Sequence, residues 1–186
     1  MPSLILKDRK LATTAKTKAA KAAVRQTREP RFKAEAMDAI ALLEADHREV
    51  HSYFDAFEAT SGKADKKALA DKICLALKVH AQIEEELFYP RAREKTGDGD
   101  LIDEALVEHA GAKILIAQIE AMLPGQPLYD AKVKVLGEQV RHHVEEEETE
   151  LFPEVRDTQI DLDALGTKLA SRKAELMRLF TSVSVA

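Results

Sequence analysis

The sequence has very little cysteine, no tryptophan and no long hydrophobic run. Its single cysteine, Cys74, cannot form an internal disulfide, which excludes a disulfide-stabilised scaffold and suits a reducing compartment. No segment approaches the roughly 20 apolar residues of a membrane span. The N-terminus also lacks the apolar core of a secretory signal, about 7 to 15 residues long. These absences predict a cytoplasmic protein without a transmembrane segment.

Aromatic residues are also scarce, at 5% of the chain, while Ala, Leu, Glu and Lys dominate. These four residue types have high helix propensity. A length of 186 residues with 45% hydrophobic content is enough for one core and short for two. The composition therefore predicts a single all-α domain with tails.

Residues 80–90 and 143–153 are near copies of each other. Each segment begins with a His, has a Glu four positions later, and ends with apolar residues and a Pro. The two pairs are His80 with Glu84 and His143 with Glu147. On an α-helix, positions i and i+4 lie on one face about one turn apart. Each pair therefore offers a nitrogen and a carboxylate oxygen to one point, as a metal ion requires.

Four amphipathic stretches contain these pairs, and each has an apolar stripe with the three- and four-residue spacing of bundle helices. The apolar members are Ala36, Ile40, Leu43, Val50, Phe54 and Phe57; Ile73, Leu77 and Leu87; Ile102, Ala105, Ala112, Ile116, Ile119 and Leu123; and Val133, Leu136, Val140 and Leu151. The stripes are interrupted by His47, by His80 with Glu84, by His109, and by His143 with Glu147.

Two interpretations of these histidines can be compared. A lone His on an apolar face is more often a hydrogen-bonded core residue than a metal ligand. Four His on four successive stripes are better explained by metal ions, because burying unpaired charge costs several kcal/mol. The neighbouring Glu145, Glu146 and Glu148 lie off the stripe, and we expect them at the surface.

Turn-forming residues divide the chain. Pro30 ends an N-terminal tail, and residues 61–65, 96–100 and 123–127 are rich in Gly, Ser, Thr, Asp or Pro. Short connections join antiparallel neighbours, which predicts an up-down-up-down four-helix bundle. A further amphipathic stretch predicts an additional C-terminal helix outside the site, with Leu162, Leu165, Leu169, Leu176 and Leu179 on its apolar face. The predicted division is a basic arm (1–33), a bundle (34–156) and a C-terminal amphipathic helix (157–186).

The predicted arm is strongly basic. Its 33 residues carry ten Lys and Arg against Asp8 and Glu29, a net charge of +8, whereas the remaining 153 residues sum to −13. Basic arms bind nucleic acid or anionic membrane surfaces, or cover the acidic body of their own or a neighbouring subunit. No recognisable nucleic-acid-binding motif occurs in it. We therefore favour a solvated or subunit-covering arm, with nucleic acid binding and oligomerisation left open.

As a set, these His and Glu residues resemble the hemerythrin-like (HHE cation-binding) family over residues 36–156. The resemblance implies four antiparallel helices that hold two non-haem irons, bridged by two carboxylates and an oxo or hydroxo oxygen. Carried over to this sequence, Glu84 and Glu147 would be the bridges. His47, His80, His109 and His143 would be the terminal ligands.

The sequence departs from oxygen-carrying hemerythrins at Lys113, where those proteins have a fifth His one turn after the third-helix His. Both irons would then keep an open position, which favours peroxide decomposition of a catalase or peroxidase type. The alternative is a module that binds or senses dioxygen, nitric oxide or iron without turnover. His51, one turn after His47, is a candidate additional ligand. Glu85 and Tyr53 are candidate partners that orient the imidazoles.

Two other metal classes fit the spacing less well. Ferritin-like proteins use Glu-x-x-His, with the His three residues after the Glu, whereas here the His precedes the Glu by four. Structural zinc sites close with four ligands. Six converging ligands that include bridging carboxylates suit a pair of ions better.

Overall fold

The structure is a computed structural model, and it describes residues 37–97 and 99–183. All regular structure in these ranges is helical. The elements are α1 (Ala39–Ala59), α2 (Lys63–Ile83), η1 (Glu84–Phe88), α3 (Tyr89–Thr96), α4 (Asp100–Glu120), α5 (Tyr129–Glu146), η2 (Glu147–Leu151), α6 (Phe152–Arg156) and α7 (Leu162–Val183). The predicted basic arm lies outside the described residues.

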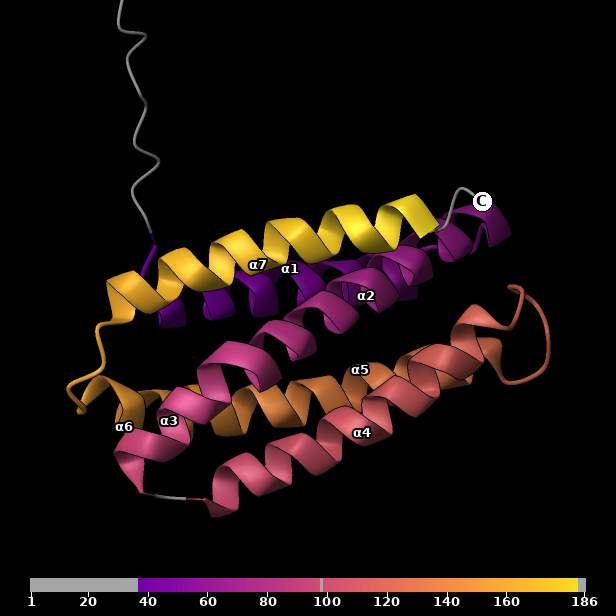
Figure 1. The fold of residues 1–186 in the computed structure, drawn as a ribbon. Coiled ribbons are helices and arrows are strands. Elements are labelled where there is room, and N and C mark those ends of the chain that lie inside the picture. Colours follow the sequence, from indigo (N-terminus) through magenta and orange to yellow (C-terminus); the bar gives the residue numbers. More distant parts are fainter. Residues whose placement is uncertain (1–36, 98, 184–186) are drawn as a thin grey trace, which may run out of the picture. The chain divides into compact units, whose positions relative to one another are not determined.

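Helices α1, α2, α4 and α5 form the predicted antiparallel four-helix bundle (Figure 1). Helix α1 packs against α2 and α5, and α4 packs against α5 and α2, which closes the ring of four. The predicted additional helix is α7, which lies along α1 and α2. The fold class expected from the sequence is therefore confirmed.

The helix ends follow local chemistry. Asp38 caps α1, because its Oδ1 accepts a hydrogen bond of 2.8 Å from the backbone N–H of Ala41. The chain leaves α3 at Gly97, whose φ of 75° lies in the left-handed region that glycine adopts without strain. The sequence predicted a spacer at residues 61–65, but α2 already begins at Lys63. Asp65 in its first turn suits the positive end of the helix dipole.

Both His–Glu repeats continue into a π-helical turn. The N–H of Tyr89 donates to the carbonyl of Glu84, and the N–H of Phe152 donates to the carbonyl of Glu147, so each bond spans five residues. A proline follows at once in each case, in the first turn of the next helix, where its missing N–H costs least. Single π-turns of this kind often mark functional sites.

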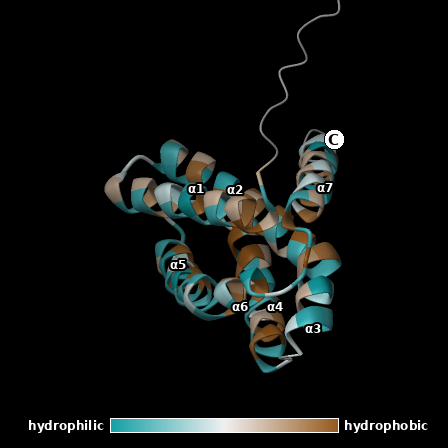
Figure 2. Cartoon of the chain, turned by 90° about the vertical axis from the view of Figure 1, so that its left-hand side faces the viewer, coloured by the Kyte–Doolittle hydropathy of each residue, from teal (hydrophilic) through white to brown (hydrophobic). Residues whose placement is uncertain are grey.

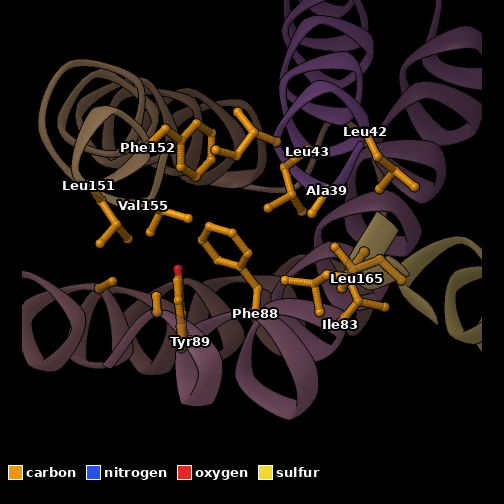
Figure 3. Packing of buried hydrophobic residues seen from close by; sticks show 14 of the residues in the cluster. Ala39, Leu42, Leu43, Ile83, Phe88, Tyr89, Leu151, Phe152, Val155 and Leu165 are labelled. Carbon is orange, nitrogen blue, oxygen red and sulfur yellow. The ribbon is translucent and has the colours of Figure 1, made fainter. Parts of the chain in front are cut away.

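The apolar core has two parts, and along α1 and α4 the site His lies between residues of one cluster and residues of the other. One cluster contains Leu43, Phe88 and Phe152, which pack together in Figure 3. The other cluster contains Phe54 and Leu136. Figure 2 shows the hydrophobic segments, in brown, gathered mainly in the interior. Burial of these side chains positions the polar layer between the clusters.

Most of the predicted apolar positions are buried or half-buried, but two leucines are exposed. Leu123 is 63% exposed because it lies beyond the last residue of α4, in the turn before α5. Leu179 is 51% exposed, on the outward face of α7. Ala36 lies outside the described residues.

The structure shows where the single cysteine lies and how long and apolar the helices are. Cys74 is a free, buried thiol in the second apolar cluster, and burial raises its pKa to about 12. It therefore stays protonated at neutral pH and contributes to packing. Within residues 37–97 and 99–183, no helix combines the length and apolar content needed to cross a membrane.

Two glycines allow a test of how α7 docks. A Cβ on Gly166 would lie 2.3 Å from the carbonyl oxygen of Met37 and 2.8 Å from the nitrogen of Ala39, so α7 would have to move. A Cβ on Gly111 would meet no atom within 4 Å. We expect Gly166→Ala to lower the free energy of unfolding by about 1–3 kcal/mol. Gly111→Ala should raise it by about 0.5–1 kcal/mol through better helix propensity. Urea unfolding measures both, and equal effects would contradict the close contact.

Candidate metal centre

The structure brings the six predicted site residues together in the bundle interior. None is more than 8% exposed. They are His47 from α1, His80 from α2, Glu84 from η1, His109 from α4, His143 from α5 and Glu147 from η2. Residues from all four bundle helices and both π-turns therefore meet in one buried polar layer.

The four imidazoles form two pairs that face each other through their Nε2 atoms. The Nε2 atoms of His47 and His80 are 3.1 Å apart, and those of His109 and His143 are 3.2 Å apart. Facing ring nitrogens offer lone pairs to the same region when each proton resides on Nδ1. Each pair can therefore present two nitrogen ligands to one cation.

Each of the two buried carboxylates reaches both pairs. Glu84 places Oε1 3.2 Å from Nε2 of His80 and Oε2 3.5 Å from Nε2 of His109. Glu147 places Oε2 3.3 Å from Nε2 of His47 and 3.4 Å from Nε2 of His143. Both glutamates thus lie between the imidazole pairs, as bridging ligands would.

The potential ligand atoms fall into two groups that share Glu84, and the atoms within each group lie within 4.8 Å of one another. The first group is His47, His80, Glu84 and Glu147, and the second is Glu84, His109 and His143. Glu84 Oε1, Glu84 Oε2 and Glu147 Oε2 are buried without a hydrogen-bond partner in the described part of the chain. Unpaired buried carboxylates cost several kcal/mol each. These orphaned oxygens fit a cation.

A carboxylate faces the outer nitrogen, Nδ1, of every imidazole. The distances are 2.9 Å from His47 to Glu148, 3.5 Å from His80 to Asp46, 2.9 Å from His109 to Glu85, and 2.8 Å from His143 to Glu108. Such partners hold the proton on Nδ1 and direct Nε2 inward, as they do around bound metals. The pattern repeats between the two halves of the bundle: one carboxylate directly precedes the His of α1 or α4, and the other directly follows the buried Glu of the repeat.

Sequence reasoning found only part of this outer layer. Glu85 bonds to an imidazole as predicted. Tyr53 instead donates to Glu49 Oε1 at 2.6 Å, away from the imidazoles. Glu148 was expected to be only a surface residue, but it also bonds to His47, because its long side chain reaches back from an exposed position. Each of the four outer carboxylates directly adjoins a site residue in the sequence, and this position could have predicted them.

Tyr89 is a further site residue that the sequence analysis missed. Its hydroxyl donates to Oε1 of Glu147 at 2.9 Å and lies 3.4 Å from Nε2 of His109. In the other repeat the same place is taken by Phe152, whose ring stacks on that of His47 with the centroids 5.8 Å apart. Tyr89 therefore adds one hydroxyl to one side of the polar layer.

The remaining candidates lie outside the two ligand groups. His51 is half-buried, and its Nε2 has no hydrogen-bond partner among the described residues. Burial, followed by the charges of His47 and Arg141, lowers the pKa of His51. Lys113 points its ammonium at Glu85, with Nζ 2.6 and 2.7 Å from the two carboxylate oxygens.

Comparison with known proteins agrees with this geometry. Residues 38–155 match the hemerythrin HHE cation binding domain. The chain belongs to this family. The resemblance found in the sequence is thereby confirmed.

Two related proteins are informative. A crystal structure of a hemerythrin HHE cation binding domain-containing protein from Mycobacterium kansasii, an Rv2633c homologue, is 25% identical with a TM-score of 0.65, and covers 76% of this chain and 88% of that one. A protein of Nostoc sp. called DNA nickase is 32% identical over 116 residues, 62% of this chain. The match spans 33% of the nickase, about a third of its length.

A small cavity adjoins the polar layer of this hemerythrin-domain protein. It has a volume of about 40 Å³, enough for a molecule of a few atoms. All four site histidines contribute to its wall, together with apolar residues such as Val50, Leu77 and Ile116, and Lys113 lies at its boundary. A small, uncharged molecule could therefore lie beside the imidazoles.

The buried His and Glu residues of the site shift one another's pKa values. Burial alone would lower the pKa of His80, but Glu84, Asp46 and Glu147 raise it to about 10. Burial opposes ionisation of Glu147 too, yet the nearby His143 and His47 lower its pKa to about 2. For His109, burial outweighs the effect of Glu84 and Glu147, so its pKa is lowered. The raised pKa of His80 favours a proton on its imidazole at neutral pH, and a metal ion would have to displace that proton.

A substitution of Glu147 tests its role as a ligand. Glu147→Gln keeps the size of the side chain but removes the charge, so we expect metal affinity to fall by at least about 10–100-fold, the range for lost partners of metal ligands. Glu145→Gln is the matched control, because Glu145 is exposed two residues before Glu147, near the end of α5, and its charge is worth less than about 1 kcal/mol. Elemental analysis after dialysis compares them. Equal metal loss in both would mean that Glu147 is not a ligand.

The pH dependence of metal binding follows from His80. In the metal-free fold its raised pKa adds stability that is complete below the ordinary value of 6.5 and is lost as the pH rises through about 10. A metal ion must displace this proton, so affinity should rise about tenfold per pH unit per displaced proton between about pH 6 and 8. Competition with a chelator measures this slope. An affinity independent of pH would contradict it.

Proposed function

We propose that this chain is a non-haem di-iron protein that decomposes small peroxides. The observation that supports it best is the placement of three orphaned oxygens of Glu84 and Glu147 between two imidazole pairs. Two iron ions held by these residues would supply reversible electron exchange with a small oxidant. The protein would supply the ligands, the apolar cavity and the proton donors.

Two ions fit the ligand set better than one. A single zinc would need four ligands in a closed tetrahedral shell. Here six ligands converge in two groups, and Glu84 belongs to both. One ion would leave an imidazole pair and a carboxylate oxygen buried without a partner. We therefore infer about two ions per chain, from the number of ligand groups.

The side chains around the cavity favour turnover over reversible storage. Lys113 occupies the place of the fifth His of oxygen carriers, and its ion pair with Glu85 holds the ammonium at the boundary of the cavity. Apolar walls limit water beside the imidazoles. The Tyr89 hydroxyl, 2.9 Å from Glu147 and 3.4 Å from Nε2 of His109, is a buried proton donor at the layer. These residues suit a small oxidant that must accept protons.

The proposal is tested by metal content and peroxide turnover. Protein made with ample iron should hold about two irons per chain, and hydrogen peroxide should be consumed many times per centre. Lys113→His should slow turnover, because an imidazole at this place would compete for an open position. Lys134→His, at an exposed lysine on α5, is the control and should leave turnover unchanged.

Two results would reject peroxide decomposition. One zinc per chain would reject the di-iron centre. Two irons with peroxide consumed only about once per site, together with a stable, reversible oxygen adduct, would favour the binding or sensing function. In that case His51, one turn after His47, would be the first residue to test as an extra ligand.

A second candidate is metal-dependent DNA strand cleavage. The relative from Nostoc is called a DNA nickase, and the first 33 residues of this chain carry a net charge of +8. Basic segments bind the phosphate backbone without reading sequence. A supercoiled plasmid that remains intact with iron- or manganese-loaded protein would eliminate this candidate.

A further inference from the structure

A third group of potential metal ligands lies on the exposed side of α4 and α5, next to the candidate centre. It consists of Glu108, His142 and Glu146. Nε2 of His142 lies 3.4 Å from Glu146 Oε1 and 3.9 Å from Glu108 Oε1. The His142 side chain is 62% exposed, whereas those of Glu108 and Glu146 are 23% and 28% exposed. A hydrated cation can therefore reach these three side chains from solvent.

This surface group is continuous with the buried layer. Glu108 uses its other oxygen, Oε2, to accept a hydrogen bond of 2.8 Å from Nδ1 of His143. Glu108 and Glu146 also line a small cavity together with His143 and Glu147. Glu147 is 3% exposed, and its Oε2 has no hydrogen-bond partner among the described residues. Glu147, whose Oε2 is unsatisfied, therefore lines the same cavity as Glu108 and Glu146 of the surface group.

The equivalent place in the other half of the bundle is closed. The repeat that aligns His80 with His143 places Val79 and Ile83 where His142 and Glu146 stand. Val79 and Ile83 are buried in the apolar cluster that includes leucines of α7. Asp46, which corresponds to Glu108, is bound by Lys173 of α7. Helix α7 therefore covers one half and leaves the other exposed.

Charge also separates the two sides. The cavity that reaches His80 from the α7 side is lined by Lys72 and Lys173 as well as by Asp46 and Glu49, so its charges offset one another. The cavity on the α4–α5 side is lined by Glu108, Glu146 and Glu147, with no lysine or arginine of the described residues in its wall. Carboxylates without an opposing ammonium group attract a divalent cation. Of the two sides compared, the one with the Glu108, His142 and Glu146 group therefore offers the more favourable approach.

We propose that Glu108, His142 and Glu146 form a loading site, which binds a divalent transition-metal ion at the surface and passes it to His143 and Glu147. The loading site rests on the metal centre proposed above. Binding is weak because the ligands are exposed and few. Glu108 takes part in both places, with one oxygen toward His142 and the other on His143.

The test measures how fast metal-free full-length protein takes up Co²⁺, a redox-stable stand-in for Fe²⁺, by stopped-flow absorption at limiting metal. His142→Ala and Glu146→Gln should each slow uptake about tenfold, the lower end of the effect of metal-site partners, while the final Co²⁺ content stays at the wild-type value. Glu145→Gln is the matched control, since it removes an exposed carboxylate beside the site. It should load at the wild-type rate.

The outcomes separate the loading site from the metal centre. Uptake by His142→Ala and Glu146→Gln at the wild-type rate would overturn the loading site and leave the centre intact. Equal slowing by Glu145→Gln would also overturn it, because the effect would then reflect general charge. A wild-type protein that binds no Co²⁺ at the buried residues would overturn both. Circular dichroism of each variant confirms that the helices are retained.

Discussion

The burial of Glu84 and Glu147 is the constraint on which the rest of this structure depends. Two carboxylates at 0% and 3% exposure, with three of their oxygens lacking hydrogen-bond partners among the described residues, are costly unless positive charge lies between them. The four imidazoles place their Nε2 atoms around the position that such a charge would take. The two apolar clusters pack the helices together around the polar layer. Hydrophobic burial therefore stabilises the arrangement of the His and Glu side chains, which their own interactions would not maintain.

The site is built from a repeated unit, and its asymmetries bear on function. Each half supplies two His, one buried Glu and two outer carboxylates in the same order. The halves differ at Tyr89 and Phe152, and at His51 and Lys113. They also differ in their surroundings, because α7 packs mainly against α1, α2 and η1, which belong to one half. The ligand layer is therefore nearly symmetric, whereas proton donation, access and charge around it are not.

The sequence was sufficient to predict the helices and to place six residues in one layer, because i to i+4 spacing and apolar stripes determine which face of a helix is buried. It did not reveal the π-turns after Glu84 and Glu147, whose five-residue bonds have no distinct side-chain pattern. Asp46 and Glu108 were also missed. Each lies off the buried stripe and meets a His from a neighbouring helix, a contact that only the packed bundle creates.

Anomalous diffraction at the iron edge, from crystals of iron-loaded protein, would locate the ions within the polar layer. We expect two peaks, one among His47, His80, Glu84 and Glu147 and the other among Glu84, His109 and His143. Both carboxylates should lie between the peaks. A single peak, or none within the polar layer, would contradict a centre of two ions held by these six residues.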